Sequence, residues 1–141
     1  MRIDDIKTFL VSNLATYIAA LSTTEVPLVS IPAGSIFTRE IHEAHGKVSL
    51  SLDDGDEQIE QLTLNTREVT LPVMAVIQVT GATMSVMSAQ AIAYAQALLN
   101  CLKTYPDFSR VVGRSNWDGV EANPNVKATK LELEFIYTEA I

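Results

Sequence analysis

The chain has 141 residues, of which 48% are hydrophobic, and a formal net charge of −7 at pH 7. This length predicts one domain, 1–141, that buries about two-thirds of the surface of the unfolded chain. The single cysteine excludes a disulfide framework and a multi-cysteine zinc site. The acidic balance argues against a nucleic-acid-binding protein, which needs a concentrated basic patch.

The charged residues are unevenly distributed along the chain. No Asp, Glu, Lys or Arg occurs from Val69 to Leu102, whereas eleven of the 17 acidic residues precede Val69. A membrane span needs about 20 consecutive apolar residues, but proline, glycine and amide side chains interrupt this stretch. Such side chains are costly in hydrocarbon, so we expect no transmembrane segment. We also expect no secretory signal, because no basic run opens the chain.

The first third of the chain predicts one helix and one short strand. Residues 3–21 repeat apolar side chains every three or four positions, which predicts an amphipathic helix. Pro27 prevents its continuation. Residues 26–37 contain two prolines and a glycine and predict a short strand at a sheet edge, and 38–46 predict an irregular segment or a helical turn.

Residues 47–52 alternate between apolar and polar side chains, as a half-buried strand does. We expect Lys47, Ser49 and Ser51 to face solvent. The acidic residues 53–57 then predict a turn at the tip of a hairpin.

The middle of the chain predicts a central strand followed by a long helix. Residues 59–67 form a second strand segment, and 69–80 are apolar on both faces, which is typical of a central strand. Residues 85–103 predict a helix with an apolar stripe. Its opposite side is polar but almost uncharged, so two interpretations stay open: a nearly buried helix, or a subunit interface. The polar side comprises Ser85, Ser88, Gln96, Asn100 and Lys103.

The last third predicts a long antiparallel pair of strands, 110–121 and 126–138, joined by a turn at 122–125. The strict alternation in 126–138 is the strongest strand signal of the chain. Together these elements predict an α+β single domain with a mostly antiparallel sheet, two main helices on one side, and the order α-β-β-β-α-β-β.

The sequence offers few groups for catalysis or metal binding. His42 and His45 lie closer together than the spacing that places two zinc ligands on one helix face, and a site would need Glu40 or Glu43 as a further ligand. Cys101 lies among apolar residues and is expected to be a small core residue rather than a nucleophile. We therefore expect no metal, no cofactor and no enzymatic activity.

Three features carry a resemblance to a known family: the opening helix, the Ala-rich helix SAQAIAYAQALLNCL, and the closing strand ATKLELEFIYTE. In this order and length they resemble the tail terminator proteins of long-tailed bacteriophages. That resemblance implies a virion protein at the head–tail junction, assembled in the host cytoplasm, which forms a ring, typically a hexamer. The ring would cap the tail tube, end its growth and meet a head-completion or connector protein, and DNA would pass through it without specific binding.

The resemblance assigns no residue-level function, but two sets of residues fit a ring. An acidic set could line the channel and keep DNA from sticking, although the same charges also suit a solvated hairpin tip; the set comprises Asp53, Asp54, Asp56, Glu57 and Glu60. A second set could form the subunit interface; it comprises Ser88, Gln96, Asn100, Met74 and Val76.

Other classes of protein remain as alternatives. The chain could be a head–tail connector or a tail tube subunit of a phage-like particle. It could also be a small enzyme that uses His42, His45 and nearby carboxylates, or a monomeric binding module unrelated to phage.

Overall fold

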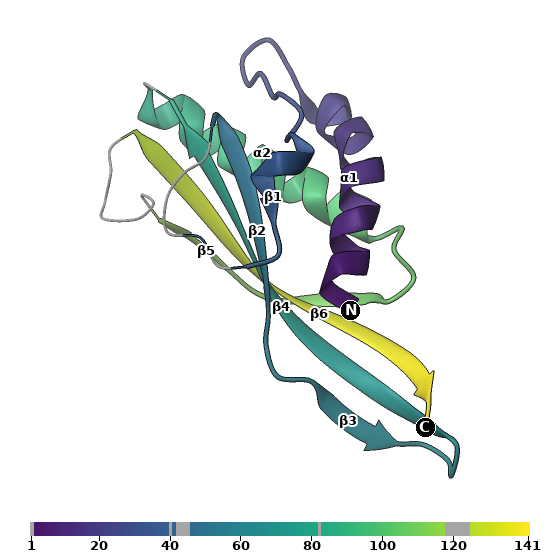
Figure 1. Cartoon of the computed structure of the whole chain (residues 1–141). Helices are drawn as coiled ribbons and strands as arrows, with labels where there is room; N and C mark the ends of the chain where they lie inside the picture. The colour runs from purple at the N-terminus through teal and green to yellow at the C-terminus, as the bar shows by residue number, and fades with distance from the viewer. Residues whose placement is uncertain (1, 40, 42–45, 82, 118–124) are drawn as a thin grey trace.

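A computed structural model of the chain describes residues 2–39, 41, 46–81, 83–117 and 125–141. In this part of the chain two helices lie on one face of a six-stranded sheet (Figure 1). The helices are α1 (Arg2–Leu21) and α2 (Met84–Leu102), and a short 3-10 turn, η1, spans Ala33–Ser35. The strands are β1 (Ile36–Phe37), β2 (Val48–Asp54), β3 (Gln58–Gln61), β4 (Thr66–Thr80), β5 (Phe108–Trp117) and β6 (Val126–Ala140).

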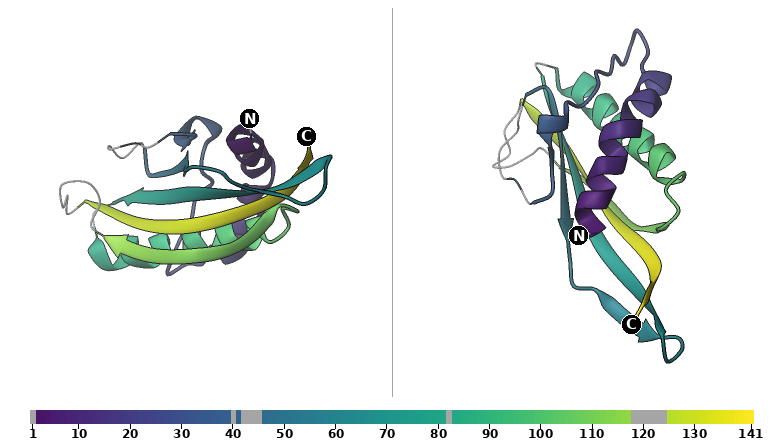
Figure 2. Two further views of the ribbon diagram at one scale, coloured as in Figure 1. Left: turned by 90° about the horizontal axis from the view of Figure 1, so that it is seen from below. Right: turned by 45° about the vertical axis from the view of Figure 1, so that its right-hand side comes forward.

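The strands follow the order β1-β2-β4-β6-β5, and β3 pairs with β4 beyond the end of β2. Every pair is antiparallel except β1 with β2. The right-hand view of Figure 2 shows both helices on the same side of the sheet. The predicted α+β class and the antiparallel sheet with helices on one side are therefore confirmed, with one more strand before α2 than expected.

The first helix forms as the periodicity predicted. One stripe of α1 is buried against the sheet and α2, and the polar side chains between these positions face outward. Burial of the apolar stripe therefore fixes the rotation of the helix about its own axis. The buried stripe comprises Ile3, Ile6, Leu10, Leu14 and Ile18.

Strands β4 and β6 form the centre of the sheet. They pair without a break over 15 positions, from Thr66 opposite Ala140 to Thr80 opposite Val126. Odd-numbered residues of both strands face the helices, where Ile77 and Phe135 are fully buried. The prediction of a central strand at 69–80 is confirmed.

The predicted strand at 26–37 is mostly wrong. Residues 26–32 have no regular structure, and only Ile36–Phe37 form a strand, which lies at the sheet edge. Side chains of α2 hold the segment instead. The Tyr94 hydroxyl accepts from Val29 N at 2.9 Å and donates to Val29 O at 2.8 Å, and Gln90 Nε2 donates to Pro27 O at 2.7 Å.

The predicted hairpin tip at 53–57 is also wrong. Asp53 and Asp54 still belong to β2, and β2 and β3 pair with successive parts of β4 rather than with each other. Gly55 N donates to Pro72 O at 2.8 Å and keeps the link between them beside β4. The acidic run therefore follows the edge of a long strand.

The expected exposure of β2 is only partly correct. Lys47 is exposed, but Ser49 and Ser51 are buried on the sheet face opposite the helices. Their side chains are short, and the longer cross-strand neighbours Gln78 and Val76 stand beside them in the register. Residues 48–52 of this strand are therefore buried on both faces.

Part of the sheet extends beyond the helices as an arm, which we define as residues 58–70 and 136–141 (Figures 1 and 2). It contains β3, the first part of β4 and the last part of β6. The predicted strand 59–67 is divided here by a turn between Gln61 and Thr66. We call the remainder of the described chain the body. No described helix has the length and apolar character needed to cross a membrane.

Candidate assembly surfaces

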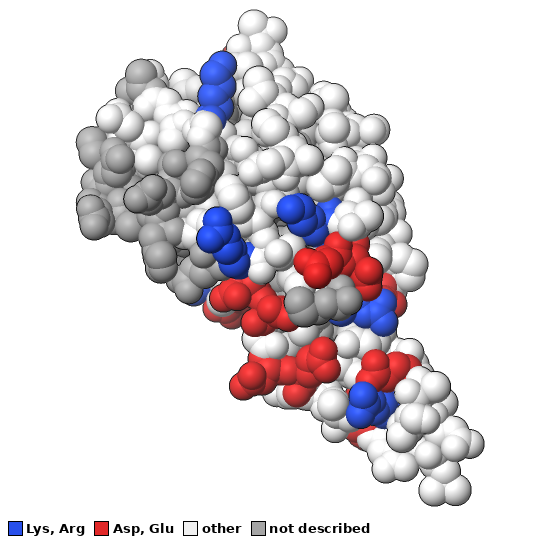
Figure 3. Space-filling model, in the orientation of Figure 1, with Lys and Arg blue, Asp and Glu red and all other residues white. Residues whose placement is uncertain are grey.

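The acidic residues singled out in the sequence lie along one border of the molecule, where the body meets the arm. Asp53 and Asp54 end β2, Asp56 and Glu57 lie in the link, and Glu60 lies in β3. All five are exposed. Figure 3 shows acidic side chains gathered around this junction. The structure therefore brings the predicted set together, on a sheet edge rather than at a turn.

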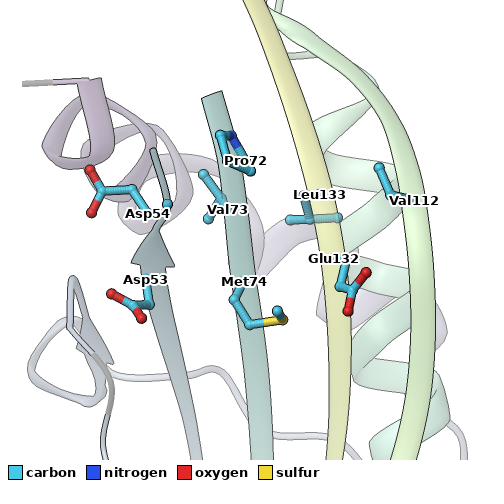
Figure 4. A pocket seen from close by; sticks show the side chains of 9 residues that line it. Asp53, Asp54, Pro72, Val73, Met74, Val112, Glu132 and Leu133 are labelled. Carbon is cyan, nitrogen blue, oxygen red and sulfur yellow. The ribbon is translucent and has the colours of Figure 1, made fainter. Parts of the chain in front are cut away.

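A shallow hollow opens beside Asp53 on the sheet face away from the helices. In the register, Met74 of β4 lies between Asp53 of β2 and Glu132 of β6. Pro72 and Val112 also line the hollow, which has a cavity volume of about 280 Å³ (Figure 4). Met74, expected at a subunit interface, thus lies among the carboxylates expected at a channel.

A second acidic pair lies within the arm. Glu60 and Glu68 stand directly opposite each other on β3 and β4, and like charges in such positions destabilise a strand pair. Neither makes an ion pair within the described part of the chain. Nearby, Arg67 forms an ion pair with Glu139 across β4 and β6. The isolated chain therefore leaves an uncompensated pair of carboxylates on β3 and β4.

A chain of polar contacts joins the body to the base of the arm. The Tyr137 hydroxyl donates to Glu57 Oε1 at 3.3 Å, and the Arg2 guanidinium lies 3.8 Å from the centre of the Tyr137 ring. Arg2 also forms an ion pair with Asp107 at 3.1 Å. We call these four residues the neck; they link α1, the α2–β5 connection, β6 and the β2–β3 link.

The neck shifts two pKa values. Burial raises the pKa of Tyr137; Arg2 opposes this increase, and the Glu57 carboxylate adds to it. Burial lowers the pKa of Arg2, but Tyr137 and Asp107 favour its charged form and outweigh that effect, so its pKa is raised overall. Arg2 therefore stays charged throughout the range in which proteins fold.

The helix candidates lie on a different face from the strand candidates. Gln96 is exposed and donates to Asn100 Oδ1 at 2.8 Å, and Asn100 and Ser88 are half-buried. Ile92 is exposed between them. α2 thus keeps a narrow open side within this chain, while most of its described positions are buried or half-buried, and both interpretations of this helix stay predictions. Val76, like Met74, points to the opposite side of the sheet, so the five interface candidates do not form one surface.

The arm carries exposed apolar residues that the sequence patterns did not single out. Leu64 is 87% exposed, Leu62 50%, Ile59 53% and Ile141 65%. The only sequence signal for Leu62 and Leu64 is their position in an otherwise polar segment, QLTLNT, which periodicity does not detect. Exposed apolar side chains that cluster in this way mark surfaces that meet a partner.

The remaining candidates are Cys101 and the residues around the two histidines. Cys101 is fully buried, and burial raises the pKa of its thiol to about 11, which suits a core residue. Glu40, Glu43, His42 and His45 lie outside the described residues. Among the residues that are described, no three His, Cys, Asp or Glu side chains are placed to hold a metal ion.

No protein-family model and no curated protein sequence matches this chain. Among solved structures, its fold is similar to that of a chain in a structure described as "Virion of native gene transfer agent (GTA) particle". The two chains share 13% sequence identity with a TM-score of 0.53, and the match covers 92% of this chain and 95% of that chain. The similarity therefore shows a shared fold over nearly the whole length of both.

Proposed function

We propose that this chain is a structural subunit of a phage-like virion particle, and that it acts there as a tail terminator. Copies would form a closed ring, most simply a hexamer, that caps the tail tube and ends its growth. The opposite side of the ring would meet a head-completion or connector protein. This role is non-catalytic and needs no cofactor.

The observation that carries the proposal is the fold shared with the gene transfer agent virion chain over 92% of this chain. The surfaces support it: a small domain that extends an arm with exposed apolar side chains has surface to offer to neighbours. The body supplies the stable part, because both helices cover one face of the sheet.

Oligomeric state tests the proposal most directly. We expect the purified protein, alone or mixed with tail tubes, to form closed rings visible by electron microscopy, with one mass by light scattering. Heterologous contacts that close give rings, whereas contacts that do not close give open polymers. Open tubes would favour a tail tube subunit. A strict monomer that does not bind tubes would contradict the proposal.

The acidic border would face the channel, where its negative potential would repel passing DNA. We expect Asp53→Asn combined with Asp54→Asn and Asp56→Asn to slow DNA release from assembled particles and to make release more dependent on salt. Glu57→Gln is added in a second variant, because Glu57 also accepts the Tyr137 hydrogen bond.

The matched control for these variants is Glu25→Gln, which removes a carboxylate at an exposed position away from the arm. Particle yield is measured alongside DNA release. Unchanged yield and unchanged release in the acidic variants would contradict the channel assignment and leave the ring intact.

A further inference from the structure

We infer that the tip of the arm of one copy docks in the hollow beside Met74 of the next copy. We define the tip as residues 61–66, the turn that joins β3 to β4. Its two leucines, Leu62 and Leu64, are exposed to solvent in the isolated chain, as apolar side chains that meet a partner are. The inference rests on the proposed function, because it names the contact that would join copies into the ring.

The polar groups of the tip are largely paired with one another. The Thr63 hydroxyl accepts from Asn65 N at 3.2 Å and from Thr66 N at 3.1 Å. Leu62 N donates to Thr66 O at 3.1 Å, and Gln61 Nε2 donates to Thr63 O at 3.0 Å. Burial of a polar group is costly unless the group is hydrogen-bonded. The tip can therefore enter the surface of a partner without leaving these groups unpaired.

The hollow offers an apolar site of sufficient size. Met74, Pro72 and Val112 line it (Figure 4), and Val112 is 56% exposed. Its cavity volume is about 280 Å³, whereas an apolar cavity of roughly 150 Å³ already accommodates benzene. A leucine side chain from a second copy therefore fits, and both apolar surfaces lose contact with water when it docks.

The charges around the hollow favour an uncharged occupant such as the tip. Asp53 and Glu132 flank Met74 in the register, on the same face of the sheet. Neither carboxylate forms an ion pair within the described part of the chain. Two free carboxylates repel an acidic segment, but residues 61–66 contain no charged residue. The tip therefore meets no electrostatic repulsion at this site.

A copy cannot fill its own hollow with its own tip. Thr66 begins β4 and Met74 lies within the same strand, and at about 3.4 Å per residue the strand between them spans roughly 27 Å. Each copy therefore gives its tip to one neighbour and receives the tip of another. Such head-to-tail contacts close into a ring or continue as a filament. Residues 56–60 do not line the hollow, so their carboxylates stay available to a channel.

Two variants that each block one side of the contact test it. We expect Leu64→Asp, which adds a carboxylate to the tip, and Val112→Asp, which adds one to the hollow, each to weaken self-association at least tenfold. An equimolar mixture should form dimers and nothing larger, because only the intact tip of one variant and the intact hollow of the other can meet. Sedimentation velocity measures both results.

The matched control is Val11→Asp, the same change at an exposed apolar position on α1, which should leave association unchanged. Tip and hollow variants that associate like this control would overturn the inference, as would a mixture that stays monomeric. Ile92→Asp tests the other uncharged apolar surface, on α2. Loss of association in Ile92→Asp but not in Leu64→Asp would assign the hollow to α2 and overturn docking of the tip.

A cross-link separates this inference from the proposed function. Leu64→Cys mixed with Val112→Cys should give intermolecular disulfides under mild oxidation. Leu64→Cys mixed with Val111→Cys should not, because Val111 stands opposite Leu133 in the register and faces the helix side of the sheet. The native Cys101 is fully buried and does not compete.

The two outcomes are distinguishable. Closed rings without the 64–112 link would leave the terminator role standing and overturn docking of the tip in the hollow. Open chains that carry the link would support this contact and overturn the terminator role.

Discussion

The body and the arm use the same two strands in opposite ways. In the body, β4 and β6 place one row of side chains under α1 and α2, where Leu71 and Phe135 are almost completely buried. In the arm, Val69 and Tyr137 at its base are still buried, but the turn at its far end exposes Leu62 and Leu64. The body therefore gains its stability from burial, whereas the arm has apolar surface that this chain alone does not cover. This difference indicates that the residues that stabilise the fold lie mainly in the body, whereas those available for assembly lie mainly in the arm.

Truncation of Phe135, the largest fully buried side chain among the described residues, should have the largest effect. Phe135 meets Phe108 and Tyr105 with ring centroids 5.5 and 5.8 Å apart. We expect Phe135→Ala to lower the free energy of unfolding by about 3–5 kcal/mol, measured by urea denaturation. Leu64→Ala, the matched change in the arm, should cost under about 0.5 kcal/mol. Equal losses would remove the distinction between body and arm.

Thiol chemistry should separate the two regions next. Burial raises the pKa of Cys101 to about 11, about two units above an ordinary thiol, so iodoacetamide should label it at least ~100-fold more slowly than an exposed cysteine at neutral pH. The rate should rise with pH up to about 11. Leu64→Cys in the Cys101→Ala background supplies the arm reference. Equal rates in the folded proteins would place Cys101 outside the core.

Removal of the neck should loosen the arm without unfolding the body. Arg2→Ala loses the contact over the Tyr137 ring and the ion pair with Asp107, worth together about 1 kcal/mol. Hydrogen exchange should accelerate at arm amides and stay unchanged around Leu50. Arg2→Lys keeps the charge and should retain part of the effect. Uniform acceleration through the whole sheet would contradict a local role for the neck.

The smallest effect on stability should accompany a large effect on assembly. We expect Leu62→Ser with Leu64→Ser to change the free energy of unfolding by less than about 0.5 kcal/mol and to weaken self-association at least tenfold. Val11→Ser, at an exposed apolar position on α1, is the control and should leave association unchanged. Unaltered association in the arm variant would show that the arm tip contacts no neighbour.

The sequence predicted the elements whose side chains alternate between core and solvent. The helix at 3–21 and the strand at 126–138 each have one apolar face. Because that face must be buried, only one orientation of each element toward the core is favourable. The second helix was also predicted to within one residue at each end, since Gly81 precedes it and its apolar stripe is continuous.

Elements that depend on distant partners were not predictable in the same way. The strand assignment for 26–37 failed because Tyr94 and Gln90, more than 60 residues away, hold that segment by hydrogen bonds. The acidic run looked like a hairpin tip because nothing in 53–57 reveals that β2 and β3 share β4 as their partner. For the candidate surfaces, the sequence identified the acidic set. That Met74 lies beside Asp53 of this set follows only from the register of β2 with β4.

The unbroken pairing of β4 with β6 also has a mechanical consequence. The two strands run from beneath the helices to the end of the arm, where Ile141 N still donates to Asn65 O at 2.8 Å. A force that pulls these strands past each other would load their hydrogen bonds in parallel, so the arm would transmit tension to the body instead of unravelling. β3, held by four pairs along one side, would detach first.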